Sequence, residues 1–184
     1  DFEHLAGVGV AMALVIGLRT ALRERGFWQR HNQPNLKNYC DLVALGTVAD
    51  AVPLIRENRV YVKTGLDILR HGQSRPGLSA LLQRCAIAPS TTGAADLAFK
   101  LAPRLNAAGR MQHADLALQL LTAAEVSGAL RLAETLDRLN RQRRQIETDM
   151  MNAVRRFLRE NPDVLNNQSL VFDRTDWHEG VLGI

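Results

Sequence analysis

One uninterrupted helical stretch constrains this chain more than any other feature. Residues 124–160 contain no Pro, and their single Gly, Gly128, lies near the start. Apolar residues such as Leu136, Leu139 and Ile146 recur there at helical spacing, while charged residues fill the other face. A helix of about 37 residues is about 55 Å long at 1.5 Å per residue. Helices of this length usually connect lobes or form coiled coils, so we expect a connector helix.

The charged face of this helix, densest in RLNRQRRQIE, has two interpretations. It is either a solvated face of alternating charge or a track for the DNA backbone. The chain carries 23 basic and 19 acidic residues, a formal net charge of +4. That excess fits an anionic partner, but it is also common in proteins that bind no nucleic acid.

The other segments indicate a globular domain of short helices. Of the 184 residues, 46% are hydrophobic and only 5% aromatic, so the core should consist of Leu, Val, Ala and Ile. The expected fold class is α/β, mostly helical. A short strand is predicted in SLVFD, residues 169–173, and a helix is predicted to end before Pro103. Apolar spacing and stop signals predict the other helices, over residues 4–26, 41–49, 60–72, 75–85 and 114–121.

The cysteines and the longest apolar stretch indicate the cellular compartment of the protein. Cys40 and Cys85 are far apart and in no metal-ligand spacing, which predicts a reduced, cytoplasmic protein without disulfides or structural zinc. The apolar residues 5–18 are too few to span a bilayer, so we expect a mostly buried helix there and no membrane contact. Because the sequence begins at Asp1 without Met and stops at Ile184 inside an apolar run, we expect it to be a piece of a longer protein.

Within DLVALGTVADAVPL, residues 41–54, Asp50 interrupts the apolar run that follows Asp41. Burying an unpaired carboxylate is costly, so Asp50 is expected to have a partner. A divalent cation is one candidate, because it needs hard oxygen ligands held by rigid backbone, here beside Gly46 and Thr47. The alternative is that Asp50 caps a neighbouring helix.

Two further motifs contain groups that bind phosphate. In PRLNAAGR, expected to be a loop, Arg104 and Arg110 flank Asn106, and the small residues AAG leave room for a ligand or a nucleic-acid strand. The alternative is a surface loop with two solvated arginines. In DWHEGVLGI, His178 can donate to a phosphate oxygen or ligate a metal, or it can be purely structural.

Three stretches, DLVALGTVADAVPL, KLAPRLNAAGRM and WHEGVLGI, together resemble in order and spacing the RecJ-type single-strand-specific exonucleases of the DHH phosphoesterase superfamily. The resemblance covers nearly the whole chain. It implies that residues 1–123 are the C-terminal part of a DHH catalytic domain and that residues 124–160 are its connector helix. Residues 161–184 would then begin the DHH-associated domain with its first strand.

The resemblance also implies a chemistry. Asp50, the acid of the GTVAD motif, would be a catalytic ligand in a two-metal centre of Mn²⁺ or Mg²⁺ that activates water to attack a phosphodiester. Arg104, Asn106 and Arg110 would bind the scissile or terminal phosphate, with His178 adding contacts from the associated domain. The implied parent digests single-stranded DNA from its 5′ end in DNA repair and recombination, alongside other repair proteins.

The sequence departs from the family pattern in one respect. Neither the Asp-rich motif nor the Asp-His-His motif, which supply the other metal ligands, occurs here. With one metal ligand of several, the chain alone is expected to be inactive. Two alternatives stay open: another DHH phosphoesterase, acting on short oligonucleotides, cyclic dinucleotides or pyrophosphate, and a non-catalytic nucleic-acid-binding module.

Overall fold

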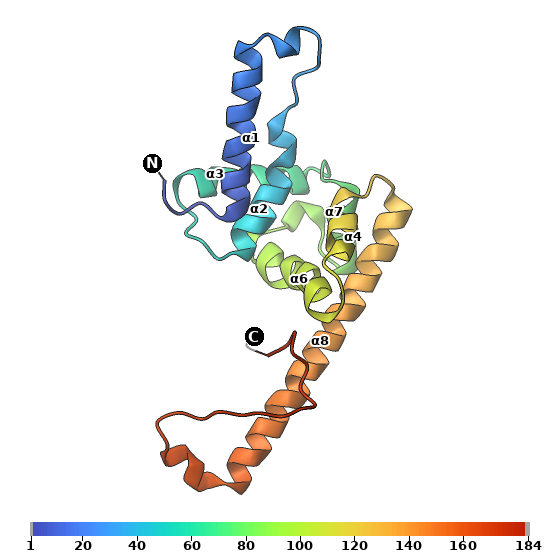
Figure 1. The fold of residues 1–184 in the computed structure, drawn as a ribbon. Coiled ribbons are helices and arrows are strands. Elements are labelled where there is room, and N and C mark those ends of the chain that lie inside the picture. The colour runs from blue at the N-terminus through green and yellow to red at the C-terminus, as the bar shows by residue number, and fades with distance from the viewer. Residues whose placement is uncertain (1, 183–184) are drawn as a thin grey trace.

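The computed structural model describes residues 2–182, and every regular element in that range is helical (Figure 1). Short 3₁₀ turns and one π-helical segment, Leu97–Leu101, join the helices. The α-helices are α1 (Gly7–Glu24), α2 (Cys40–Ala49), α3 (Arg56–Arg70), α4 (Pro76–Arg84), α5 (Ala94–Asp96), α6 (Ala102–Met111), α7 (Asp115–Thr122) and α8 (Val126–Glu160).

The expectation of a mostly helical chain is confirmed, whereas the strand that would give it α/β character does not form among the described residues. Residues 169–173, predicted as a strand, run without regular structure. A strand needs a neighbour to accept its backbone hydrogen bonds, and none of the described residues offers one. Instead, this part of the chain returns beside the second half of α8 (Figure 1), where Phe172 meets Phe157 edge to face at 5.6 Å between ring centroids.

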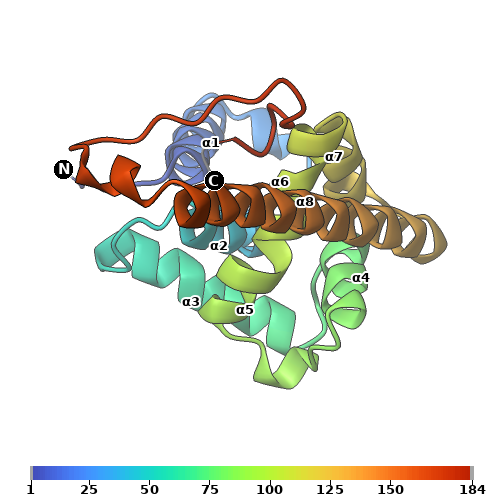
Figure 2. The ribbon, with the colours of Figure 1, turned by 90° about the horizontal axis from the view of Figure 1, so that it is seen from below.

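The long helix α8 confirms that residues 124–160 are almost entirely helical. Its first half packs on α4, α6 and α7 and buries Ala129, Ala133, Leu136 and Leu139. Beyond Asn140 no residue of α8 is buried, and the helix projects from the helical domain (Figure 1). Seen from below, α8 crosses the domain with α3, α4 and α5 on one side and α1 and α7 on the other (Figure 2).

Leucines dominate the main core, as the low aromatic content predicted. Seven of them, from α3, α4, the π-helical segment, α7 and α8, are inaccessible to solvent: Leu69, Leu78, Leu81, Leu97, Leu101, Leu120 and Leu136. The helix pair α2 and α3 forms the most extensive contact and leads directly to the segment that contains Asp50. No described helix has both the length and the hydrophobicity to cross a bilayer.

The first helix forms as predicted, but it is not mostly buried. In α1 only Gly9 and Met12 are buried, whereas Val10, Leu14 and Leu18 are 56%, 73% and 57% exposed. Helical spacing of apolar residues shows which side chains share a face, but it does not show what covers that face. Here α1 packs mainly on α2, and its outer end rises away from the other helices (Figure 1).

Candidate functional site

Asp50 follows the last residue of α2, and its side chain is exposed to solvent. The expectation that it is a buried charge in need of a partner is therefore wrong. Its backbone N–H donates to Gly46 O at 3.0 Å, which finishes the helix. No hydrogen bond or ion pair to the Asp50 carboxylate occurs among the described residues, and it does not cap α3, whose N-cap is Ile55. Both carboxylate oxygens are therefore free to bind a ligand.

The loop after Asp50 is held in an unusual backbone conformation. Ala51 and Arg56, at its two ends, have φ angles of 55° and 44°, values that cost non-glycine residues about 1–3 kcal/mol each. Asn58, fully buried in α3, fixes the loop from inside: its Nδ2 donates to Pro53 O at 3.0 Å and to His4 O at 2.7 Å. The surroundings thus stabilise a strained turn beside a free carboxylate, as is common at functional sites.

Asp50 is suited to be one ligand of a metal ion, but the described residues around it do not supply the other ligands. Its carboxylate supplies the hard oxygens that Mn²⁺ and Mg²⁺ prefer. Within residues 2–182, however, no three His, Cys, Asp or Glu side chains lie close enough together to hold a metal ion. A metal centre that includes Asp50 therefore needs further ligands that residues 2–182 do not place beside it.

The PRLNAAGR segment is helical, so the loop expected there, and the helix end expected before Pro103, are both wrong. Pro103 lies in the first turn of α6, directly after the π-helical segment, where its missing N–H costs little. Ala107 and Ala108 are fully buried, so these small residues let α6 pack closely rather than leave room for a ligand. Asn106 and Arg110, four residues apart, occupy the exposed side.

The structure brings the second and third motifs together. Arg110 Nη1 donates to Gly180 O at 3.4 Å. Gly180 lies so close to the Arg110 carbonyl that a Cβ atom at this position would collide with it. Val181, only 3% exposed, anchors the same turn. Residues far apart in the sequence therefore form one surface at the end of α6.

His178 is oriented by this turn. Its Nδ1 accepts the backbone N–H of Gly180 at 3.1 Å, and the ring is half-buried. Because Nδ1 is the acceptor, the proton of the neutral imidazole resides on Nε2. The Nε2–H group is therefore the ring donor that a ligand such as a phosphate could use.

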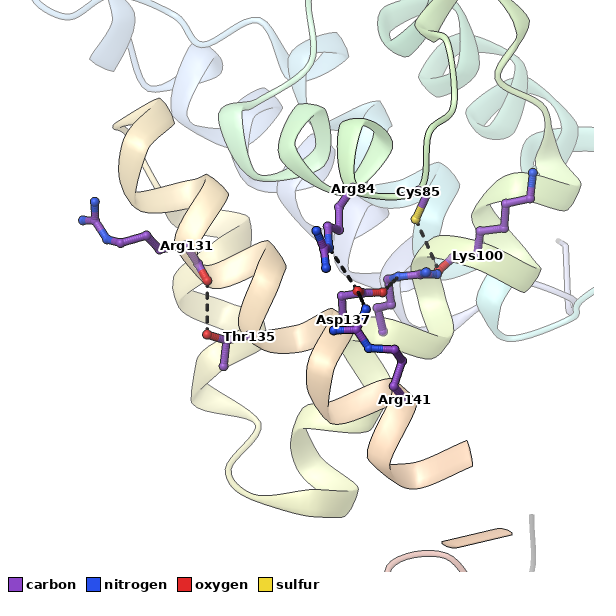
Figure 3. A network of polar contacts seen from close by, with 8 residues as sticks. Arg84, Cys85, Lys100, Arg131, Thr135, Asp137 and Arg141 are labelled. Carbon is purple, nitrogen blue, oxygen red and sulfur yellow. Dashed lines mark hydrogen bonds and ion pairs between the residues drawn. The ribbon is translucent and has the colours of Figure 1, made fainter. Parts of the chain in front are cut away.

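Arg104 points to a different place, the first half of α8. Its Nε donates to Asp137 Oδ1 at 2.9 Å and its Nη1 to Lys100 O at 2.7 Å. Asp137 is only 4% exposed and also pairs with Arg84 of α4 and Arg141 of α8, both at 3.0 Å (Figure 3). Burial alone raises the pKa of Asp137, but the hydrogen bonds from Arg104 and Arg84 outweigh it and hold this pKa below its usual value.

Sequence reasoning missed Asp137 and Asn58. Asp137 lies between Leu136 and Leu139 on the buried stripe of α8, and Arg141 follows it by four residues, so a buried ion pair within the helix was detectable. Arg84 and Arg104 are 53 and 33 residues away, and no local pattern joins them to Asp137. Asn58 gives no sequence signal, because its partners are backbone carbonyls.

The predicted site residues therefore fall into three places. Asp50 stands alone at the end of α2, and no hydrogen bond or ion pair within residues 2–182 joins it to the other four. Arg110 and the His178 turn lie together, with Asn106 one helical turn before Arg110. Arg104 belongs to the group around Asp137.

Comparison with known proteins agrees with this motif pattern. No family model matches the chain. The single-stranded-DNA-specific exonuclease RecJ of Salmonella typhimurium is 43% identical over 187 residues, which include 99% of this chain and 32% of that protein. The RecJ exonuclease of Bacillus subtilis is 34% identical over 183 residues, covering 100% of this chain and 21% of the relative. The chain thus spans about a third of the length of the Salmonella relative and less of the Bacillus one.

Solved structures give the same result. A crystal structure of exonuclease RecJ bound to manganese matches with a TM-score of 0.79 and 33% identity, over 100% of this chain and 43% of that one. RecJ from Thermus thermophilus in complex with Mn²⁺ matches with a TM-score of 0.68 and 34% identity, over 85% of this chain and 23% of that one. Over its whole length the chain is homologous to one segment of the RecJ single-stranded-DNA-specific exonucleases, which confirms the resemblance.

Proposed function

We propose that this chain is part of a metal-dependent exonuclease that hydrolyses single-stranded DNA in the 5′ to 3′ direction. The observation that supports this most is the 43% identity to a single-stranded-DNA-specific exonuclease over 99% of the chain. The free carboxylate of Asp50, next to a strained and tightly held loop, adds physical support.

The proposed roles of the site residues come from the motif resemblance, and their geometry is compatible with these roles. Asp50 supplies one carboxylate ligand to a Mn²⁺ or Mg²⁺ site, whose remaining ligands lie elsewhere in the longer protein. When bound, such ions supply Lewis-acid activation of water for attack on a phosphodiester. Arg110, Asn106 and His178 Nε2–H bind a backbone phosphate at the end of α6. Arg104 binds phosphate through its Nη2 group, which contacts no acceptor among the described residues.

The proposed organisation follows the same homology. Residues 1–123 form the C-terminal part of the catalytic domain, residues 124–160 the connector and residues 161–184 the start of an associated domain. The full-length protein acts in DNA repair and recombination in the cytoplasm, alongside other repair proteins. The chain alone is inactive, because its described residues contain no complete metal site.

A comparison of substrates tests this proposal. The full-length protein that carries this chain, supplied with Mn²⁺, is incubated with a long 5′-labelled single strand, a blunt duplex and a dinucleotide. We expect release of nucleotides from the single strand and an intact duplex. Digestion of the dinucleotide alone would indicate a DHH phosphoesterase of short substrates. Salt-dependent binding without hydrolysis would indicate a non-catalytic module.

A further inference from the structure

Three arginines from three helices converge on the single carboxylate of Asp137; Arg84 and Arg141 are labelled beside it in Figure 3. Arg84 comes from α4, Arg104 from α6 and Arg141 from α8. No other acid within residues 2–182 forms an ion pair with any of them; Glu134 lines the same hollow as Arg84 without pairing with it. The group therefore retains an excess of positive charge at a place where α8 meets the helical domain.

The geometry of these pairs leaves many donors unused. A guanidinium has five N–H donors. Arg84 and Arg104 each contact Asp137 through Nε alone, and Arg141 contacts it through Nη1. By contrast, Arg75 binds Asp41 through two hydrogen bonds, from Nε to Oδ2 at 2.9 Å and from Nη2 to Oδ1 at 3.0 Å. Arg75 and Asp41 form a closed structural pair, whereas the Asp137 group keeps most of its donors free.

The free donors are accessible. The side chains of Arg84, Arg104 and Arg141 are 36%, 20% and 62% exposed, while Asp137 beneath them is buried. Arg138 and Arg144, both exposed and unpaired among the described residues, extend the positive charge along α8. Guanidinium groups arranged in this way suit the oxygens of a phosphate, which they bind with two donors at once.

We propose that Arg84, Arg104 and Arg141 together form a binding site for a phosphate of the nucleic-acid backbone, and that Asp137 is its positioning residue. Asp137 accepts a hydrogen bond from Nε of Arg84 and from Nε of Arg104 and so anchors both guanidinium groups at this place. The site recognises backbone charge and not base sequence. This inference rests on the proposed function, since it places more of the substrate's backbone on the same protein.

Charge-removing variants test the site. In the full-length protein, Arg84→Gln and Arg141→Gln keep hydrogen-bonding capacity but lose charge, and each is expected to weaken binding of a fluorescent single-stranded oligonucleotide about tenfold. The slope of log K against log salt concentration should fall by about 0.7 for each lost phosphate contact. The matched control is Arg131→Gln, an exposed arginine of α8 that points away from Asp137 (Figure 3) and should change affinity less than about twofold.

Asp137→Asn separates positioning from simple electrostatics. This change makes the group more positive, so charge alone predicts tighter binding of the oligonucleotide. Positioning predicts weaker binding, because Arg84 and Arg104 lose their charged anchor. Thermal unfolding of each variant shows whether it is folded. If Asp137→Asn does not fold, Arg84→Gln and Arg141→Gln still test whether the arginines bind phosphate.

The outcomes are distinct from those of the proposed function. If the wild-type protein digests single strands while Arg84→Gln and Arg141→Gln bind and digest them equally well, the arginines only brace the helices and the inference is wrong. Tighter binding by folded Asp137→Asn contradicts its positioning role. If the wild-type protein neither binds nor digests single strands, the proposed function fails and this inference fails with it.

Discussion

Arg75→Met is expected to lower the free energy of unfolding by about 3–5 kcal/mol, because it leaves a buried carboxylate without its cation. Asp41 is only 1% exposed, and both its oxygens bond to Arg75. Arg75 also donates to Leu121 O at 3.3 Å, so it joins α2 to the end of α7. Urea unfolding followed by circular dichroism measures the loss.

Two matched variants check the reason for this loss. Arg174 and Asp176 form a similarly two-bonded pair at the surface, so Arg174→Met should leave stability unchanged within error. The double variant Asp41→Leu with Arg75→Met removes both charges and should be more stable than Arg75→Met alone. An Arg75→Met protein as stable as the wild type would show that the buried pair contributes nothing.

Gly65→Ala is the second large effect, with an expected loss of about 3 kcal/mol. Gly65 lies where α3 crosses α2, and a Cβ atom there would collide with the Cys40 carbonyl oxygen and with Ala44 Cβ. A backbone carbonyl cannot rotate away as a long side chain can, so the two helices must separate. The tight pairing of α2 with α3 also sets the position of Asp50, and this variant should therefore lose activity in the full-length protein.

The control for Gly65→Ala is a glycine in open space. A Cβ atom on Gly17 of α1 would meet nothing within 4 Å. Because Ala favours the helix, Gly17→Ala should stabilise the protein by about 0.5–1 kcal/mol. Equal stability changes at both positions would mean that close helix packing does not explain the glycine at residue 65.

Periodic signals in the sequence predicted most of the helices. The long helix α8 and the start of α4 at Pro76 could be predicted from the sequence, because each depends on residues close together in the chain. PRLNAAGR was misinterpreted because Pro, Asn and Gly favour loops locally, whereas burial of Ala107 and Ala108 holds the segment in α6. The strand predicted for residues 169–173 lacks a pairing partner among the described residues, which no local pattern can supply.

Site geometry was less predictable than the helices. The sequence singled out Asp50, Arg110 and His178, but it could not show that Asp50 is exposed or that Gly180 lies against Arg110. These facts depend on how distant segments pack. The same holds for Asp137, whose partners Arg84 and Arg104 lie on other helices.

The central claim, that Asp50 is a metal ligand of an exonuclease, is tested most directly by a manganese titration of the full-length protein and its Asp50→Ala variant. Nucleotide release from a 5′-labelled single strand and Mn²⁺ binding by calorimetry are measured together, with Asp163→Ala, an exposed acid outside the site, as control. Our account predicts metal-dependent digestion, a loss of at least about 100-fold in activity and weakened Mn²⁺ binding for Asp50→Ala, and wild-type behaviour for the control. Wild-type activity and metal affinity in Asp50→Ala would contradict it.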